Sequence, residues 1–505
     1  GAVCVGIFML LLDITIVNVA LPDIQKSLGS SFSDLQWVVD AYSLTLAALL
    51  LTAGSLADLL GRRRVFAIGL ALFTLASLAC GLATTPLMLN VFRALQGIGG
   101  AAMFATSLAL LAQAFHGRER GTAFGAFGAT IGAAVAVGPL IGGALTDGLG
   151  WEWIFFVNIP IGIGAIAVTL LRVVESRDPR GAAIDWPGLV TFSAALFMLV
   201  FALVRGNAEG WGSTLIVTLL AGSAVLLVAF VFIERSRERP MLDLTLFRNR
   251  TFVGASAVAF TLSASMFAMF LYLTLYIQNV LGYMPFQAGL RFLPITALSF
   301  FVAPVAGRLA VRIEPRFLLG TGLLLVNIGL VLMSAVDADS GWTVLLGGFV
   351  AAGFGIGMIN APLTQVAVGV VPPERSGMAS GINNTFRQVG IATGIAALGA
   401  IFQSEVGTRT TDALASSSAG RAVLSNVGGH ISGAAISNGS GGALMSNVPS
   451  GARQAVAHAL RVGFTGALSE ILAIGAVVAL VGAVAGYALV RKQDFVASGP
   501  GAAAV

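Results

Sequence analysis

Apolar segments of about 20 residues follow one another along the whole chain, and they decide what it can fold into. A helix of that length crosses the ~30 Å hydrocarbon core of a bilayer with its backbone hydrogen bonds made internally. The 505 residues are 57% hydrophobic and only 10% charged, which excludes a soluble globular domain. Strand-like alternation is absent from the sequence, so we predict an all-α polytopic membrane protein. The fourteen predicted spans cover residues 2–22, 37–60, 65–84, 87–112, 121–146, 153–172, 187–204, 213–233, 252–279, 285–311, 317–336, 342–370, 377–403 and 462–490.

Lys and Arg lie mainly in alternate loops between these spans. Nineteen of the 28 basic residues fall on one side of the predicted membrane, in alternate loops and the C-terminal tail. By the positive-inside rule that side is cytoplasmic, and an even number of spans puts both termini there. The net charge of +5 therefore reflects topology and not a nucleic-acid-binding surface. The chain begins at Gly1, inside the first span, so we expect the native start to be missing.

Asp13 places one carboxylate inside the first apolar segment, roughly 13 Å from either end at helical rise. A carboxylate at that depth costs at least ~2.5–3.5 kcal/mol, so it must face water or a partner. Arg93 lies about two turns inside the fourth span and also needs a partner, while Gln96 lies one turn deeper on nearly the same face. We predict that these three residues act together, and the alternative is a purely structural Asp bonded to a neighbouring helix.

The sequence repeats itself at an offset of about 255 residues. The repeated pairs are Ala53-Gly54 with Ala306-Gly307, Gly97-Ile98-Gly99 with Gly353-Phe354-Gly355, and Glu119-Arg120 with Glu374-Arg375. The repeat predicts six spans (1–173), an insert of two spans (174–245) and six further spans (246–495), followed by a tail (496–505). A long outer loop, 404–461, has no convincing periodicity beyond a possible helix at 450–460. Duplicated membrane halves around a central site are typical of transporters.

Charged residues are not repeated in the second half. Asp58 becomes Val311, Arg93 becomes Phe349, and no acid in the ninth span stands for Asp13. Chemistry that needs charge is therefore predicted to be concentrated in the first half.

Two glycine motifs lie near these charges. Gly54…Asp58…Gly61-Arg62 joins the second and third spans, where Asp58 can pair with an arginine or with the positive end of a helix, worth ~0.3–1 kcal/mol. Such a pair forms a latch if it exists in only one conformation; the alternative is ordinary positive-inside topology. In the fifth span, Gly138 and Gly142 form a small-xxx-small surface for close helix contact, Gly143 follows them, and Pro139 adds a kink.

Jointly, these motifs resemble the fourteen-helix drug:proton antiporter family of the major facilitator superfamily, over almost the whole chain. The matching segments are Leu12-Asp13…Asn18-Val19-Ala20-Leu21-Pro22, Trp37-Val38-Val39-Asp40-Ala41-Tyr42, the two glycine motifs, Arg93…Gln96-Gly97, Trp151…Asn158-Ile159-Pro160 and Arg375-Ser376-Gly377…Arg387-Gln388. The resemblance implies the major facilitator fold with 6+2+6 helices, and proton-driven multidrug efflux by alternating access in a bacterial cytoplasmic membrane. It also implies that Asp58 and Arg62 gate the cytoplasmic side and that Gly138-Pro139 marks an antiporter. Asp13 and Arg93 are implied to take part in the movement of protons and substrate. Glu152 stands where the family more often has Arg.

Three further charges remain. Asp40 starts the second span on the outer side, where it can accept protons or cap the helix. Arg387 lies ~16 Å into the thirteenth span and Glu470 about as deep in the fourteenth, so we expect them to pair. Trp37, Tyr42 and Gln96 join them as candidates for the substrate cavity. An adaptable apolar pocket, or simple packing, is expected of Phe8, Met9, Phe104, Met266, Phe267, Met269, Phe270, Tyr272 and Tyr276.

The function expected from the sequence is proton-coupled export of lipophilic drugs or other small amphipathic compounds by a monomer that uses the proton gradient and no cofactor or metal. A cationic substrate is favoured, and neutral and zwitterionic compounds are the alternatives. The alternatives are a dedicated exporter or symporter of one metabolite or lipid, and a non-transporting sensor on the same scaffold. An ATP-driven pump is excluded, because neither Lys26 nor Lys492 is preceded by the glycine of a Walker A loop. We expect no enzymatic activity.

Overall fold

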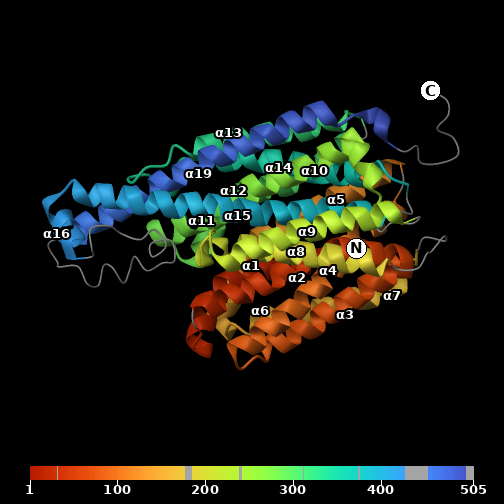
Figure 1. Ribbon diagram of the computed structural model, residues 1–505, viewed down its shortest axis with the longest axis horizontal. Helices are drawn as coiled ribbons and strands as arrows, with labels where there is room; N and C mark the ends of the chain where they lie inside the picture. Colours follow the sequence, from red (N-terminus) through yellow and green to blue (C-terminus); the bar gives the residue numbers. More distant parts are fainter. Residues whose placement is uncertain are drawn as a thin grey trace.

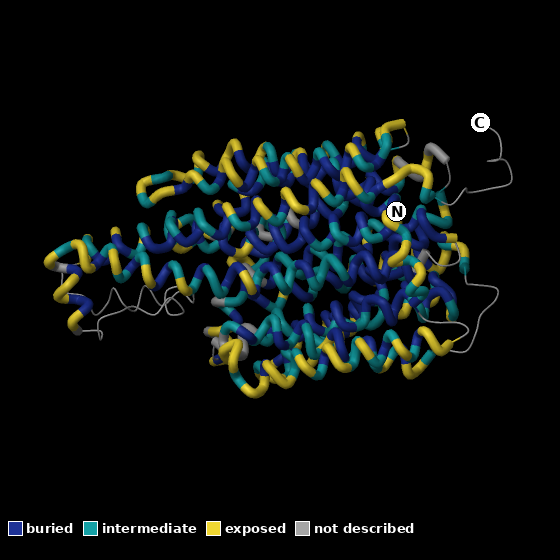
Figure 2. Tube along the Cα trace, turned by 45° about the horizontal axis from the view of Figure 1, so that its top comes forward, coloured by how far each residue is buried: buried dark blue, intermediate teal, exposed yellow. Residues whose placement is uncertain are grey.

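The computed structural model describes residues 1–30, 32–115, 117–176, 185–237, 242–310, 312–372, 376–426 and 453–495, and all regular structure in these ranges is helical. The helices form an elongated bundle, with most of them running along its long axis (Figure 1). Buried residues concentrate along the middle of the bundle, and exposed ones on its outer faces (Figure 2). The all-α prediction is therefore confirmed for the described residues.

Every predicted span lies on a helix. Within the described ranges, twelve helical segments are long and apolar enough to cross a membrane. Two further helices, α1 (Ala2–Leu28) and α5 (Gly117–Leu149), contain shorter apolar stretches, Ala2–Val17, Thr122–Ala134 and Leu140–Leu149. The twelve segments are formed by α2 (Phe32–Leu60), α3 (Arg62–Gly81), α4 (Pro86–Ala114), α6 with α7 (Trp153–Phe156, Asn158–Arg172), α8 (Trp186–Glu209), α9 (Thr214–Ser236), α10 to η3 (Arg250–Val280), α12 (Pro285–Leu309), α13 (Pro315–Met333), η4 with α14 (Trp342–Leu345, Leu346–Gly369), α15 (Ser376–Ala415) and α19 (Arg453–Leu489).

Local sequence signals fix several helix ends. Thr85 accepts a hydrogen bond from the first turn of α4 and is followed by Pro86, which suits a first helical position. Asp185 caps α8 in the same way, and Asn249 caps α10. Gly61 separates α2 from α3 with φ of 110°, a conformation that favours glycine.

Helices extend into the segment 404–461, so the expectation of irregular structure is wrong for residues 404–426, whereas the possible helix at 450–460 is confirmed from Arg453 onward. α15 continues to Ala415, α16 (Ser418–Asn426) follows, and α19 begins at Arg453; residues 427–452 lie outside the described ranges. α15 and α19 pack on each other beyond the other spans, with Gly463 against Thr410. This extension projects from one end of the bundle (Figure 1). Its buried apolar residues, such as Val406, Leu414 and Val456, are interspersed with Ala, Ser, Thr and Gly, so no apolar run of span length marks it in the sequence.

Two sets of helices, α1 to α7 and α10 to α19, pack in equivalent ways. In the first set, Gly99 of α4 packs on α3 at Gly69, and Gly97 packs on α2. In the second set, Gly355 of α14 packs on α13, and Gly353 packs on α12. The repeated glycines therefore make the same kind of helix contact twice. The sets meet where α5 packs on α12 and α2 packs on α15. α8 lies against both α2 and α15, and α9 packs on α8.

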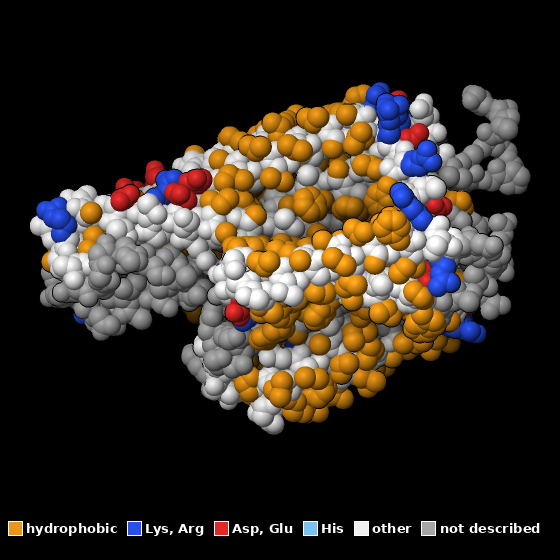
Figure 3. All heavy atoms as spheres, viewed as in Figure 1, with side chains coloured by type: hydrophobic (Ala, Val, Ile, Leu, Met, Phe, Trp, Pro, Cys, Tyr) orange, Lys and Arg blue, Asp and Glu red, His pale blue; other side chains and the backbone are white. Residues whose placement is uncertain are grey.

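Charge is distributed unevenly between the two ends of the bundle. The start of α1 and the end of α19 lie at the same end (Figure 1). Lys and Arg side chains gather at that end, and hydrophobic side chains cover the middle of the visible face (Figure 3). A second, smaller group of charges lies on the projecting extension of α15 and α19.

Candidate functional site

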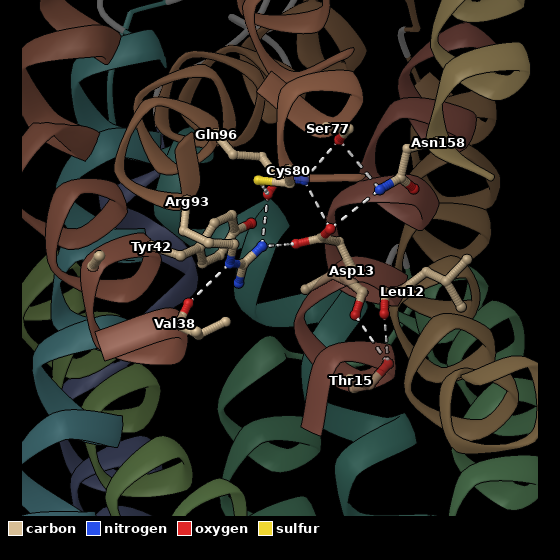
Figure 4. Close-up of polar contacts among 12 residues, drawn as sticks. Leu12, Asp13, Thr15, Val38, Tyr42, Ser77, Cys80, Arg93, Gln96 and Asn158 are labelled. Carbon is tan, nitrogen blue, oxygen red and sulfur yellow. Dashed lines mark hydrogen bonds and ion pairs between the residues drawn. The ribbon is translucent and has the colours of Figure 1, made fainter. Parts of the chain in front are cut away.

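Asp13 lies at the centre of a buried polar network that joins α1, α4 and α7 (Figure 4). Its Oδ2 pairs with Arg93 NH1 at 2.5 Å. Its Oδ1 accepts hydrogen bonds from Gln96 Nε2 at 2.7 Å and Asn158 Nδ2 at 3.1 Å. All four side chains are at most 1% exposed. The predicted association of Asp13, Arg93 and Gln96 is confirmed in its geometry.

Ser77 of α3 extends the network to a fourth helix. Its hydroxyl accepts from Gln96 Nε2 at 2.7 Å and from Asn158 Nδ2 at 3.3 Å. Gln96 Oε1 in turn accepts from Arg93 NH1 at 2.7 Å, so the amide bridges the cation and the serine. A buried network of this kind fixes the relative positions of the helices that contribute to it.

The Arg93 guanidinium is enclosed on its remaining sides by α2 and by an aromatic ring of α6. Its Nε donates to the Val38 carbonyl at 2.9 Å, and the Tyr42 ring lies 4.3 Å from the guanidinium carbon. The Phe155 ring is 5.9 Å away. A buried cation of this kind is stabilised by the carboxylate, the carbonyl dipole and the ring face together. Of the predicted cavity residues, Tyr42 and Gln96 therefore belong to the charge network.

Gly97 allows α4 to approach α2 closely enough for these contacts. A Cβ atom at this position would collide with the Tyr42 carbonyl oxygen and the Thr45 hydroxyl. Without that close approach, Arg93 could not reach the Val38 carbonyl. Gly97 thus positions Arg93 by letting α4 lie close to α2.

The glycine motif of α5 packs directly behind Asp13. A Cβ at Gly138 would collide with the Thr15 side chain, and one at Gly142 would lie 3.1 Å from the Ile16 carbonyl oxygen and 2.9 Å from its Cγ1. The predicted small-xxx-small contact is therefore confirmed, with α1 as its partner.

The other two residues of this motif have different surroundings. Gly143 faces Phe286 of α12, and a Cβ added at Gly143 would lie 3.8 Å from the nearest Phe286 atoms, an ordinary van der Waals contact. Pro139 lies within α5, and its kink stays a prediction.

Asp58 connects α2 to the start of α15. Its Oδ1 accepts from Arg62 Nε at 2.9 Å, and its Oδ2 accepts from the Met378 backbone N–H at 3.0 Å. Met378 lies in the first turn of α15, where backbone N–H groups lack helical partners, so Asp58 caps that helix from the other set of spans. Gly54 is buried in α2, and Gly61 ends that helix. The pairing expected of Asp58 is present.

Asp40 and Trp37 lie away from the network and face α8. The Arg205 guanidinium lies 5.7 Å from the Trp37 ring, which also contacts Phe201 at 5.5 Å. Asp40 shares a small cavity with these three side chains. The structure therefore places both residues against the inserted helices and does not bring them to Asp13.

Arg387 and Glu470 do not pair, so that prediction is wrong. Glu470 binds Arg409 at 2.5 Å, and Arg387 NH2 donates to Asn360 Oδ1 at 2.5 Å. α15 and α19 are antiparallel with Gly463 against Thr410, so Glu470 is level with about residue 403, ~24 Å from Arg387 along the helix. The error arose because α19 begins at Arg453, well before the predicted start of its span.

A cavity lies between α5 and the second set of spans. Two of the aromatic residues proposed for a pocket, Phe267 and Phe270, line it together with Thr296, Ser299 and Asn360. The other members of the proposed set pack in the apolar cores, namely Phe8, Met9, Phe104, Met266, Met269, Tyr272 and Tyr276.

Sequence reasoning gave no role to three residues that hold these sites together. Ser77 and Asn158 complete the Asp13 network, and Glu175 accepts the backbone N–H groups of Arg63 and Arg64 at 3.0 and 3.2 Å, capping α3. Asn158 opens α7 as an amide beside apolar residues, which was a usable signal. Ser77 and Glu175 carried none, because a serine is common in membrane helices and an acid is common in loops.

A sequence model of the Major Facilitator Superfamily matches residues 3–395. The chain belongs to the major facilitator superfamily. Among its superfamily relatives, the "Multidrug resistance protein Stp" of Mycobacterium tuberculosis is 41% identical over 397 residues, covering 78% of this chain and 74% of that protein. The "Tetracenomycin C resistance and export protein" of Streptomyces glaucescens is 36% identical over 421 residues, covering 83% and 78%. These matches confirm the resemblance to multidrug-resistance transporters, which are not enzymes.

A solved major facilitator structure supports the fold independently. The human organic anion transporter MFSD10 superposes with a TM-score of 0.60 at 16% identity, covering 79% of this chain and 92% of that one. At this identity the likeness shows the fold alone. The chain is thus an all-helical, multi-pass membrane protein of this superfamily.

Proposed function

We propose that this chain is a proton-coupled efflux antiporter that exports lipophilic drugs or other small amphipathic compounds by alternating access. The names of its relatives, which state multidrug resistance and tetracenomycin C export, support drug efflux. The proton gradient is its energy source, and a monomer in a bacterial cytoplasmic membrane is the working unit. The clustering of Lys and Arg at the end that holds the start of α1 supports cytoplasmic termini.

Fourteen spanning helices in a 6+2+6 arrangement are part of this proposal. α1 and α5, with 27 and 33 residues, are long enough to cross a bilayer although their apolar stretches are interrupted. α8 and α9 pack on each other, and α8 contacts one helix of each set, α2 and α15. That placement suits an insert (174–245) between two transport halves, 1–173 and 246–495.

The observation that carries the proposal is the Asp13 carboxylate, which is fully buried and bonded to Arg93, Gln96 and Asn158. In the ionised state it compensates the Arg93 charge. A proton on Asp13 removes that compensation and turns an acceptor into a donor, so the network must rearrange. Since it joins α1, α3, α4 and α7, the rearrangement changes how these helices pack.

The Asp58 contact supplies the second element of the cycle. It ties α2 to α15 at the end where Lys and Arg gather, so it holds that end closed. We propose that opening toward the cytoplasm breaks the Asp58–Met378 bond, and that the protonation state of Asp13 decides when this happens.

The test uses inside-out membrane vesicles that contain the full chain and a respiratory proton gradient. Uptake of tetracenomycin C into these vesicles is followed with the wild type, with Asp13→Asn and with the matched control Asp339→Asn, whose carboxylate is exposed in a loop. Wild type and control should accumulate the compound until a protonophore collapses the gradient. Asp13→Asn should lose gradient-dependent accumulation while remaining in the membrane at the wild-type level.

Gradient-driven accumulation at the wild-type rate by Asp13→Asn would refute the assignment of Asp13. Accumulation of the compound only in right-side-out vesicles would instead indicate uptake by symport. A wild type that moves one metabolite or lipid and none of a panel of drugs would point to a dedicated transporter.

A further inference from the structure

Arg387 is a cation deep in the second half that has no acidic partner among the described residues. It lies eleven residues after the start of α15, about 16 Å along the helix. Its NH2 group donates to the Asn360 side-chain oxygen, and its Nε has no hydrogen-bond partner although it is buried. A guanidinium stays charged in such a place, and it therefore requires an acceptor that these residues do not supply.

The groups around Arg387 are also donors without partners. The Asn360 Nδ2 amide and the Asn383 Nδ2 amide, one turn before Arg387 on α15, are both buried and unbonded. So is the Ser299 hydroxyl of α12. Asn360, Asn383 and Ser299 are each no more than 3% exposed. Each unmet buried donor destabilises the protein by roughly 1–3 kcal/mol, so a set of them favours a ligand that brings acceptors.

Two of these donors belong to the cavity between α5 and the second set of helices. Asn360 and Ser299 line it directly, and Arg387 reaches its wall through the bond to Asn360. The rest of the lining is largely apolar and includes Phe267, Phe270 and Gly132 of α5. Phe267 ends a π-helical turn, η2 (Ser263–Phe267), a distortion frequent at functional sites.

We infer that this cavity, about 20 Å³ in this conformation, widens during the transport cycle to bind an aromatic compound that carries an anionic or strongly accepting oxygen group, such as a carboxylate or phenolate, directed toward Asn360 and Arg387. The inference rests on the proposed export function and names its substrate class. It departs from the cation expected from the sequence. No Asp or Glu is among the described residues that line the cavity, and the Asp13 carboxylate is already bonded to Arg93, Gln96 and Asn158.

The test is equilibrium binding to the full chain in lipid nanodiscs, with no proton gradient. Three probes share one fluorescent ring system and differ in charge: 1-pyrenecarboxylate, 1-pyrenemethanol and 1-pyrenemethylamine. Fluorescence anisotropy gives the dissociation constant of each. The wild type should bind the carboxylate about 10-fold or more tightly than the amine, as expected for a charge-assisted hydrogen bond.

Two variants test the source of this preference. Arg387→Gln removes the cation. Asn360→Asp is nearly isosteric and gives Arg387 an internal carboxylate, so it keeps the protein folded if Arg387→Gln does not. Both should abolish the preference for the carboxylate and leave pyrenemethanol binding within twofold. Arg316→Gln, an exposed arginine paired with Glu314, is the matched control and should bind all three probes as the wild type does.

The inference would be overturned if the wild type bound none of the probes, or if it bound the amine at least as tightly as the carboxylate. It would also be overturned if Asn360→Asp kept the preference for the carboxylate, or if it lost affinity for all three probes equally. The outcome is separate from that of the vesicle experiment, because binding without a gradient does not require Asp13 to couple protons.

Discussion

The Asp13–Arg93 pair predicts a large energetic coupling that can be measured without any transport assay. The perturbation is a double-mutant cycle of Asp13→Asn, Arg93→Gln and the combination of both. The pair is 2.5 Å long, with side-chain exposures of 0% and 1%, so neither charge is compensated by bulk water.

The magnitude of each single change follows from what it leaves behind. In Asp13→Asn the amide offers one acceptor where the carboxylate offered two, so it cannot satisfy Arg93, Gln96 and Asn158 together. Arg93 then stays charged with only the Val38 carbonyl, Gln96 and an aromatic ring around it. Breaking a buried pair from one side costs roughly 3–5 kcal/mol. Arg93→Gln strands the carboxylate in the same way.

The double variant buries no net charge. Its loss in free energy of unfolding should therefore be smaller than the sum of the losses in the two single variants, by about 2 kcal/mol or more. The assay is unfolding of the purified chain in mixed micelles by titration with SDS, followed by far-ultraviolet circular dichroism. Additivity of the two single losses within about 0.5 kcal/mol would refute the reasoning, because it would mean that the two charges do not interact in the folded state.

Three shorter predictions concern the other contacts. Asp58→Asn should raise hydrogen exchange at the Met378 amide about 10-fold or more, since a hydrogen bond to a charged group contributes ~1.5–3 kcal/mol; unchanged exchange would show that the cap is dispensable. Gly142→Ala should lower stability by ~1–3 kcal/mol through crowding against α1, whereas Gly164→Ala, which has open space around it, should lower it not at all; equal melting temperatures would contradict the packing. Arg409→Gln should change stability by at most ~1 kcal/mol, because its pair with Glu470 is about 40% exposed on both sides, and a larger loss would contradict this.

Elements and close helix contacts were predictable because membrane spans carry strong local signals. Every predicted span has its helix, and Asp13, Arg93 and Gln96 could be grouped since each is too polar to stand alone in lipid. The glycines of α5 were assigned a helix contact from their spacing, although the partner, α1, was not deducible. Such signals describe one helix at a time, and they do not identify the neighbouring helix that packs against it.

The failures share that cause. The depth of Glu470 was counted from an assumed span start near Arg461, but the helix begins at Arg453, and the partner of Glu470 is Arg409. The sequence around Asp40 does not indicate that this residue faces Arg205 of α8, because the contact depends on where α8 and α9 pack against the other helices. Ser77 is one of many helical serines, and only the three-dimensional arrangement singles it out.

The two sets of helices hold different charges. At the offset of 256 that relates Gly97 to Gly353, Arg93 corresponds to Phe349; at the offset of 255 that relates Glu119 to Glu374, Arg387 corresponds to Gly132, which lines the cavity. Each half thus carries one deep arginine at a position where the other half has no charge. The first has a carboxylate partner, which suits a site that gains and loses a proton. The second has none, which suits a site that receives an acceptor from outside.

If the two sites have these separate roles, substitutions should separate the dependence of export on the proton gradient from the binding preference for the carboxylate probe. Asp13→Asn should remove the dependence of export on the gradient and leave the pyrene binding preference intact, because its network contacts none of the cavity-lining residues. Asn360→Asp should do the reverse, changing which probe binds while accumulation of an uncharged aromatic compound still follows the gradient. Loss of both properties in either variant would mean that the two halves share one charged site, and the assignment of separate roles would fail.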